Sequence, residues 1–112
     1  MYIKISKEEF MEKAKKDCYW TLTDKATQRI YEVLTELNVN FNLEGVLNDF
    51  MWGSKEMTLT DIWEETKGTF KTMKELEEYL EEAFEIKIDN APYTVFASFE
   101  YENKEKGYIL RF

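Results

Sequence analysis

A chain of 112 residues and 13.5 kDa has the size of a single domain, and its 44% hydrophobic and 16% aromatic content is typical of a globular core. The 15 basic residues stand against 23 acidic ones, and the formal net charge of -8 argues against a general nucleic-acid binder, which would neutralise phosphates with lysine and arginine. There is no histidine, so the commonest general base and the imidazole ligand of zinc, copper and haem iron are both missing.

The N-terminal half predicts two capped helices. Residues 2–5 alternate in hydropathy and predict a short strand. Ser6, with Glu9 three residues later, forms a capping box that predicts a helix through about residue 17. Thr23 opens a second helix, which ends in the polar segment 38–40. Its apolar residues recur at helical spacing and are Ala26, Ile30, Val33, Leu34 and Leu37.

The middle of the chain is less regular. Residues 41–52 place five apolar side chains on one helical face, although their first residues also fit an extended stretch, and we interpret them as a helix. Gly53 interrupts this segment. Thr58 and Asp61 resemble another capping box and predict a short helix over residues 59–66, which ends before Gly68.

The last third changes from helical to strand periodicity. Thr72 caps a helix with an apolar stripe on one side and Glu and Lys on the other. Residues 84–88, 93–101 and 108–112 then alternate in hydropathy, with polar turns between them, which predicts an antiparallel β-meander. The expected fold is α+β: one domain over residues 1–112, with several helices on one face of a three- to four-stranded antiparallel sheet.

Nothing in the sequence assembles a catalytic site. Cys18 is expected to be a structural cysteine, because it follows a predicted helix C-terminus, whose dipole disfavours a thiolate, and has no histidine to activate it. The adjacent carboxylates at 64–65 and 81–82 point ~100° apart on a helix and do not converge. We therefore expect a protein that is not an enzyme, with no cofactor and no metal. A carboxylate–metal hydrolase is a third hypothesis, which a thermal shift with magnesium would support.

The lone cysteine also bears on location. A single thiol is typical of a reducing compartment, and the N-terminus lacks the apolar run and cleavage site of a secretory signal. No stretch reaches the ~18 consecutive apolar residues of a membrane helix. We expect a cytoplasmic protein without membrane contact.

The negative charge is concentrated in the C-terminal part. Residues 1–40 hold seven acidic and seven basic residues, whereas residues 41–112 hold sixteen and eight. Six glutamates between residues 75 and 85 lie off the apolar stripe, about one carboxylate per ~2.5 Å of helix axis. Duplex DNA carries one charge per ~1.7 Å of axis, or ~3.4 Å on each strand, so a basic groove built for DNA could accept this helix. The alternative is a solvated helix face that keeps the protein soluble.

The 18 aromatic residues provide a second feature, because they exceed what a small core usually needs. Trp52 and Trp63 flank the break at residues 53–54. In the predicted strand over 93–101, Phe96 lies on the face opposite Tyr93, Val95 and Phe99. An exposed aromatic set rimmed by acids resembles an interface hot spot. Alternatively, the helices cover the face that carries Tyr93, and the other aromatic set packs beneath the segment 41–63, so that neither set is exposed.

Residues 22–95 contain a characteristic order of features. They are a tyrosine- and leucine-containing helix, Phe-Asn-Leu-Glu at 41–44, a Ser/Thr-rich start to an acidic helix, Leu-Glu-Glu-Tyr-Leu at 76–80 and Asp-Asn at 89–90. This pattern resembles small acidic counter-defence proteins of phages and mobile elements, of the antirestriction and anti-CRISPR type. The family pattern has a strand where residues 46–51 read here as a helix. The resemblance implies a non-enzymatic protein, and some of its members occupy the nucleic-acid groove of a nuclease.

Together these features predict a protein that inhibits a nucleic-acid-processing defence complex, such as a CRISPR effector nuclease of the bacterial host cell, by occluding a basic groove. It would not bind nucleic acid directly. The alternative is a phage or mobile-element accessory protein that acts by self-association or scaffolding. The expected partner-binding residues are Asp61, Glu64, Glu65, Glu75, Glu77, Glu78, Glu81, Glu82, Glu85, Trp52, Trp63 and Tyr79.

Overall fold

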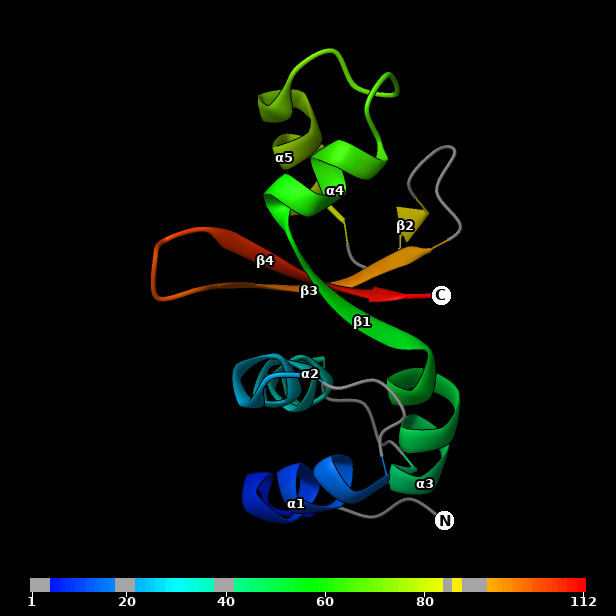
Figure 1. The fold of residues 1–112 in the computed structure, drawn as a ribbon. Coiled ribbons are helices and arrows are strands. Elements are labelled where there is room, and N and C mark those ends of the chain that lie inside the picture. Colours follow the sequence, from blue (N-terminus) through cyan, green and yellow to red (C-terminus); the bar gives the residue numbers. More distant parts are fainter. Residues whose placement is uncertain (1–4, 18–21, 38–41, 84–85, 88–92) are drawn as a thin grey trace.

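A four-stranded antiparallel sheet lies between two helical layers (Figure 1). The computed structural model describes residues 5–17, 22–37, 42–83, 86–87 and 93–112. Within these ranges the predicted α+β class and the antiparallel sheet are confirmed. The predicted strand at 2–5 lies largely outside them, as do Cys18 and Glu85.

The sheet contains β1 (Ser54–Thr58), β2 (Ile86–Lys87), β3 (Thr94–Glu100) and β4 (Lys106–Arg111) in the order β1-β4-β3-β2. The predicted C-terminal meander is confirmed, because β2, β3 and β4 are antiparallel neighbours. The fourth strand, β1, adds to the outer side of β4. It comes from a segment that the sequence analysis treated as a break between two helices.

One helical layer comes from the N-terminal half. It contains α1 (Lys7–Asp17), α2 (Asp24–Glu36), α3 (Leu43–Gly45), the π-helical turn η1 (Val46–Phe50) and the 3-10 turn η2 (Met51–Gly53). Ser6 and Thr23 accept hydrogen bonds from the backbone N–H of Glu9 and Ala26, so the predicted caps hold α1 and α2. The expected helix at 41–52 is confirmed from residue 43, although its hydrogen bonding changes to the π and 3-10 patterns.

The other layer consists of α4 (Leu59–Glu65) and α5 (Met73–Glu81). Thr58 and Thr72 cap them by accepting from the N–H groups of Asp61 and Glu75, as the sequence predicts. Gly68, at a φ of 98°, turns the chain between them in a conformation that suits glycine. No helix in the described ranges is long and apolar enough to cross a membrane.

The expectation that the helices cover one face of the sheet is wrong. Tyr108 and Leu110 belong to a core beneath α4 and α5, whereas Ile109 between them belongs to a core formed with α1, α2 and η1. All three side chains are fully buried. A continuous apolar run of this kind is typical of a strand that is covered on both faces.

A β-bulge explains why the alternation in β3 is misleading. The register shifts between Val95 and Ala97, so Phe96 is an extra residue. Val95 packs in the core beneath α4 and α5, whereas Phe96 and Ala97 both pack in the core on the other face. The predicted single face with both Tyr93 and Phe99 on it is therefore divided between the two layers.

Candidate functional site

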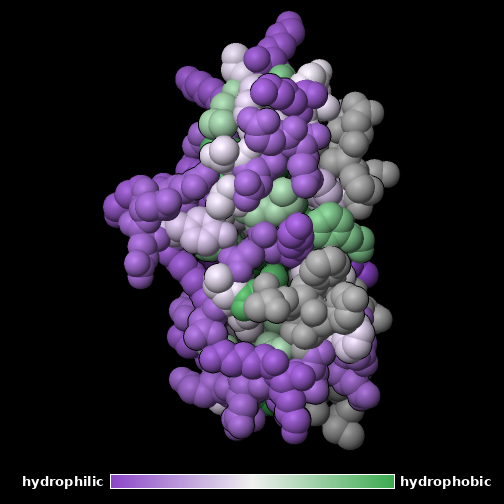
Figure 2. All heavy atoms as spheres, in the orientation of Figure 1, coloured by the Kyte–Doolittle hydropathy of each residue, from purple (hydrophilic) through white to green (hydrophobic). Residues whose placement is uncertain are grey.

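The acidic surface is built on α4 and α5, which pack against each other on one face of the sheet (Figure 1). Residues 59–83, which span both helices, carry eight acidic and three basic residues, so this segment accounts for five of the eight net negative charges. Leu76 and Leu80 of α5 are buried in the core beneath it, which turns the carboxylates on the opposite side of the helix away from the sheet. In Figure 2 hydrophilic atoms cover much of this upper layer.

The carboxylates of α5 form two rows. Glu77 and Glu81, one helical turn apart, both reach Lys106 of β4, and the distance from Lys106 Nζ to Glu77 Oε1 is 2.6 Å. Glu78 and Glu82, also one turn apart, are exposed on another side of the helix. The single charge of Lys106 therefore compensates one of the two carboxylates of the first row, and the second row faces outward.

Glu75 begins the outer row and also supports the helix start. It is exposed, and its carboxylate accepts a hydrogen bond from the backbone N–H of Lys71 at 3.3 Å. Its own N–H donates to Thr72 Oγ1 at 3.1 Å. The negative charge lies in the first turn, where the helix dipole favours it.

The shorter helix α4 contributes three further exposed acids. Asp61 is in its first turn, Glu64 is paired with Lys67 at 3.6 Å, and Glu65 ends the helix. The Glu64–Lys67 pair is largely in solvent, with side chains 61% and 65% exposed, so it holds the carboxylate weakly. Together α4 and the outer row of α5 offer six exposed carboxylates: Asp61, Glu64, Glu65, Glu75, Glu78 and Glu82.

Two carboxylates, one from α4 and one from α5, affect tyrosines in the core by their negative charge. Burial, followed by the charge of Glu65, raises the pKa of Tyr93 from 10.0 to about 12. Burial, followed by the charge of Glu77, raises the pKa of Tyr108 to about 12. Both phenols therefore remain neutral at pH 7, and neither adds a negative charge to this layer.

The expected aromatic residues do not form one cluster. Trp63 and Tyr79 are half-buried and pack against the core beneath α4 and α5. The centroid of the Tyr79 ring is 5.2 Å from that of the Phe70 ring. Trp52 lies in the other layer and is 45% exposed. It lines a pocket of about 400 Å³ with residues from the end of α1 and from α3 and η1, namely Lys16, Asp17, Glu44, Leu47 and Asn48.

The β3–β4 hairpin contributes contacts that the sequence analysis missed. Glu105 accepts a hydrogen bond from Thr60 Oγ1 at 2.6 Å and therefore ties the hairpin to the start of α4, as Lys106 ties it to α5. These partners are 45 and 29 residues apart in the chain, so no local spacing indicates them. Hydrophilic atoms also cover the end of this hairpin, which projects to the left in Figures 1 and 2.

Within the described ranges, no three acidic or cysteine side chains converge in a way that could hold a metal ion. Comparisons with protein-family models, with curated proteins and with solved structures found no match.

Proposed function

We propose that this protein is a non-enzymatic inhibitor that binds a nucleic-acid-processing defence complex, with a CRISPR effector nuclease as its target, in the cytoplasm of a bacterial host cell. It binds through α4 and α5 and occludes a groove whose lysines and arginines hold nucleic acid. The observation that carries the proposal is that 25 of the 112 residues, 59–83, hold five of the eight net negative charges on one face of the sheet.

The spacing of the carboxylates supports a contact surface formed by both helices. The outer row of α5, at residues 75, 78 and 82, places about one carboxylate per ~5 Å of helix axis, which is sparser than the ~3.4 Å of phosphates along one DNA strand. The three acids of α4 add charge beside this row. Phosphate-like density therefore requires Asp61, Glu64 and Glu65 together with the outer row.

Charge alone increases the association rate more than the affinity. The exposed parts of Trp63 and Tyr79, which lie half-buried in the same layer, provide apolar contact area beside the carboxylates. Glu77 and Glu81 have an internal role, because their pairing with Lys106 holds α5 on the sheet.

The test is cleavage of target nucleic acid by purified CRISPR effector complexes in the presence of the protein. We expect inhibition at a stoichiometric ratio that weakens as salt rises. The double variant Glu78→Lys/Glu82→Lys is expected to raise the inhibitory concentration at least tenfold. The matched control is Glu8→Lys/Glu12→Lys, which makes the same change in charge on exposed residues of α1, in the other layer.

The control should inhibit within about twofold of the parent protein. Two results would contradict the proposal: no inhibition of any effector class, or equal inhibition by the two double variants. Circular dichroism of both variants shows whether they fold as the parent does.

The second candidate, an accessory protein that self-associates, is favoured by one observation. Trp52 is 45% exposed beside a mixed-charge pocket in the layer opposite the acidic surface, and such an aromatic suits a contact between copies. Sedimentation at two concentrations tests this, because a dimer formed through Trp52 should be lost in Trp52→Ala. A protein that is monomeric at both concentrations would leave inhibition as the better supported function.

A further inference from the structure

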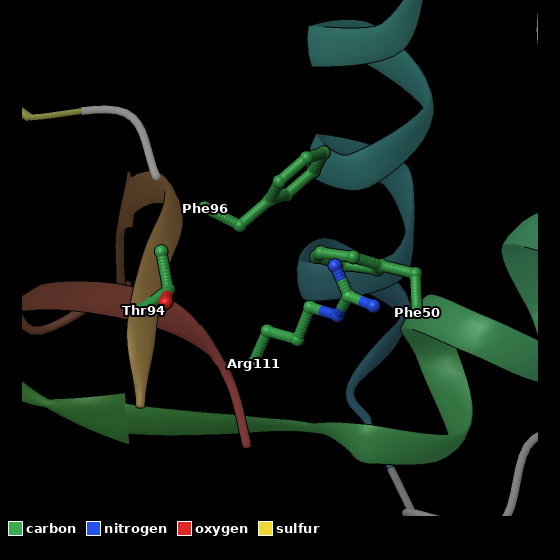
Figure 3. Close-up of a pocket in the computed structure, with 4 residues that line it drawn as sticks. All are labelled: Phe50, Thr94, Phe96 and Arg111. Carbon is green, nitrogen blue, oxygen red and sulfur yellow. The ribbon is translucent and has the colours of Figure 1, made fainter. Parts of the chain in front are cut away.

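A second site lies on the face of the sheet opposite the acidic surface, between η1 and the ends of β3 and β4. Phe50, Thr94, Phe96 and Arg111 line a pocket of about 250 Å³ there. Figure 3 shows Arg111 extending from β4 toward the ring of Phe50, with the ring of Phe96 beyond it. The centroids of the two phenylalanine rings are 4.0 Å apart, and the guanidinium carbon is 5.9 Å from the centroid of Phe50.

Two irregularities of the backbone create this pocket. Phe50 is the last residue of the π-helical turn, and Phe96 is the extra residue of the β-bulge. Each irregularity replaces regular hydrogen bonding and turns a side chain away from the direction that a regular element would give it. Both types are frequent beside functional sites. That both direct an aromatic ring to the same place indicates a site that the fold builds.

Arg111 supplies a positive charge that the described parts of the chain do not neutralise. The chain has two arginines. Arg29 donates to the carbonyl oxygen of Ser98 at 2.9 Å and to Glu36 at 3.1 Å. Arg111, by contrast, makes no ion pair within the described ranges, and it is exposed. Its planar fork of N–H donors matches a carboxylate, which it can bind through two parallel hydrogen bonds.

We propose that this pocket binds a single carboxylate attached to a flat apolar group, either a small aromatic acid or the C-terminal residue of a peptide. Arg111 binds the carboxylate, Thr94 offers one hydroxyl donor, and the rings of Phe50 and Phe96 form the apolar wall. The pocket is smaller than the ~300–1,000 Å³ usual for drug-sized ligands, so the apolar group is about one ring in size. The net charge of -8 disfavours multiply charged anions such as nucleotides. The site is independent of the proposed inhibitor surface.

The probe is 3-phenylpropionate, titrated into ¹⁵N-labelled protein and followed by amide chemical shifts. Its neutral amide is the ligand control, and inorganic phosphate tests the preference for a carboxylate. A short peptide ending in phenylalanine, with a free or an amidated C-terminus, distinguishes the two sources of the carboxylate. We expect the carboxylate to bind at least tenfold more tightly than the amide and than phosphate.

Arg111→Gln should weaken binding of 3-phenylpropionate at least tenfold, and Arg111→Lys, which keeps the charge but loses the fork, should weaken it severalfold. Lys55→Gln is the matched control, because Lys55 is an exposed cation on β1 whose register partner is Leu110, which faces the other core. It should bind within twofold of the parent. The proposal would be overturned if 3-phenylpropionate and its amide bound equally, or if phosphate bound more tightly than 3-phenylpropionate. It would also be overturned if neither 3-phenylpropionate nor the peptide with a free C-terminus bound detectably, or if Arg111→Gln bound 3-phenylpropionate as tightly as the parent does.

Discussion

Lys106 of β4 donates to Glu77 of α5 across a distance of 2.6 Å, and the same ammonium group also binds Glu81. Both side chains of the first pair are 35% exposed, so water screens this contact less than it screens the Lys67–Glu64 and Lys104–Glu100 pairs. The pair joins a helix to the central sheet and brings together residues 29 positions apart in the chain. Without Lys106, Glu77 and Glu81 would lie side by side uncompensated, and the charge of Glu77 is close enough to Tyr108 to add to the effect of burial on its pKa.

Replacing Lys106 with methionine should therefore reduce the free energy of unfolding by about 1–2 kcal/mol. Denaturation by guanidinium chloride at pH 7 measures the change. Lys104→Met is the matched control, because Lys104 pairs with Glu100 at 3.5 Å with side chains 85% and 55% exposed, and its loss should cost under about 0.5 kcal/mol. Equal losses in the two variants would show that the Lys106 contacts add no stability.

The parts of the fold that depend on near neighbours could be predicted from the sequence. Ser6, Thr23, Thr58 and Thr72 each accept from the N–H group three residues later, as their capping patterns indicate. The apolar stripes of α2 and α5 likewise identified buried residues, because helical spacing is a local property.

Strand β1 could not be predicted, because Met57 is its one buried apolar side chain and the residues on its other face are polar. Ser54 is fully buried and donates to the carbonyl oxygen of Phe50, and Glu56 binds Thr23 and Tyr101. A strand whose polar side chains are satisfied by distant partners shows no hydrophobic alternation. The division of the α5 carboxylates had the same cause, since Lys106 comes from another element.

The two buried phenols predict a loss of stability at alkaline pH. The pKa values of Tyr93 and Tyr108 are raised from 10.0 to about 12, chiefly by burial, so the folded state holds these protons more tightly than the unfolded chain does. Their contribution is fully present below pH 10 and is lost as the pH rises toward 12. Unfolding curves at pH 8 and pH 11, with tyrosine ionisation followed at 295 nm, measure this loss.

Tyr108→Phe isolates one of the two groups. The Tyr108 hydroxyl has no hydrogen-bond partner among the described residues and is fully buried, so its removal should leave stability at pH 8 unchanged or raise it by about 1 kcal/mol. Between pH 8 and pH 11 the variant should lose about 1 kcal/mol less than the parent. A variant with the same alkaline loss as the parent would show that Tyr108 ionises equally easily in both states.

Lys104 adopts a φ of 71° in the β3–β4 turn, which is the left-handed conformation that suits glycine. The turn requires this conformation, because two backbone hydrogen bonds close it. The N–H of Lys104 donates to the carbonyl oxygen of Tyr101 at 3.0 Å, and the N–H of Tyr101 donates to the carbonyl oxygen of Glu105 at 2.9 Å. Lys104→Gly should stabilise the protein by about 1 kcal/mol. Lys104→Ala loses the same ion pair with Glu100 without relieving the backbone, so it should give no gain in the same unfolding assay. A gain in alanine equal to that in glycine would assign the effect to the lost charge.

Glu56 links β1 to the start of α2 and to the hairpin. Its carboxylate accepts from the N–H of Thr23 at 2.6 Å, from Thr23 Oγ1 at 3.0 Å and from the hydroxyl of Tyr101 at 3.0 Å. A negative charge at this position also suits the N-terminus of α2, whose dipole is positive there. Burial raises the pKa of Tyr101 first, and the hydrogen bond to Glu56 raises it further.

Glu56→Gln keeps the shape of the side chain but has only one acceptor oxygen, so it cannot serve both Thr23 and Tyr101 equally. We expect a loss of about 1–2 kcal/mol at pH 7 and a lower pKa for Tyr101. A double-mutant cycle with Tyr101→Phe gives the share of the Tyr101 bond, which should be about 1 kcal/mol. If the two losses simply add, Glu56 acts on α2 alone, and the side-chain contacts of the hairpin at Glu105 and Lys106 hold it to the α4–α5 layer.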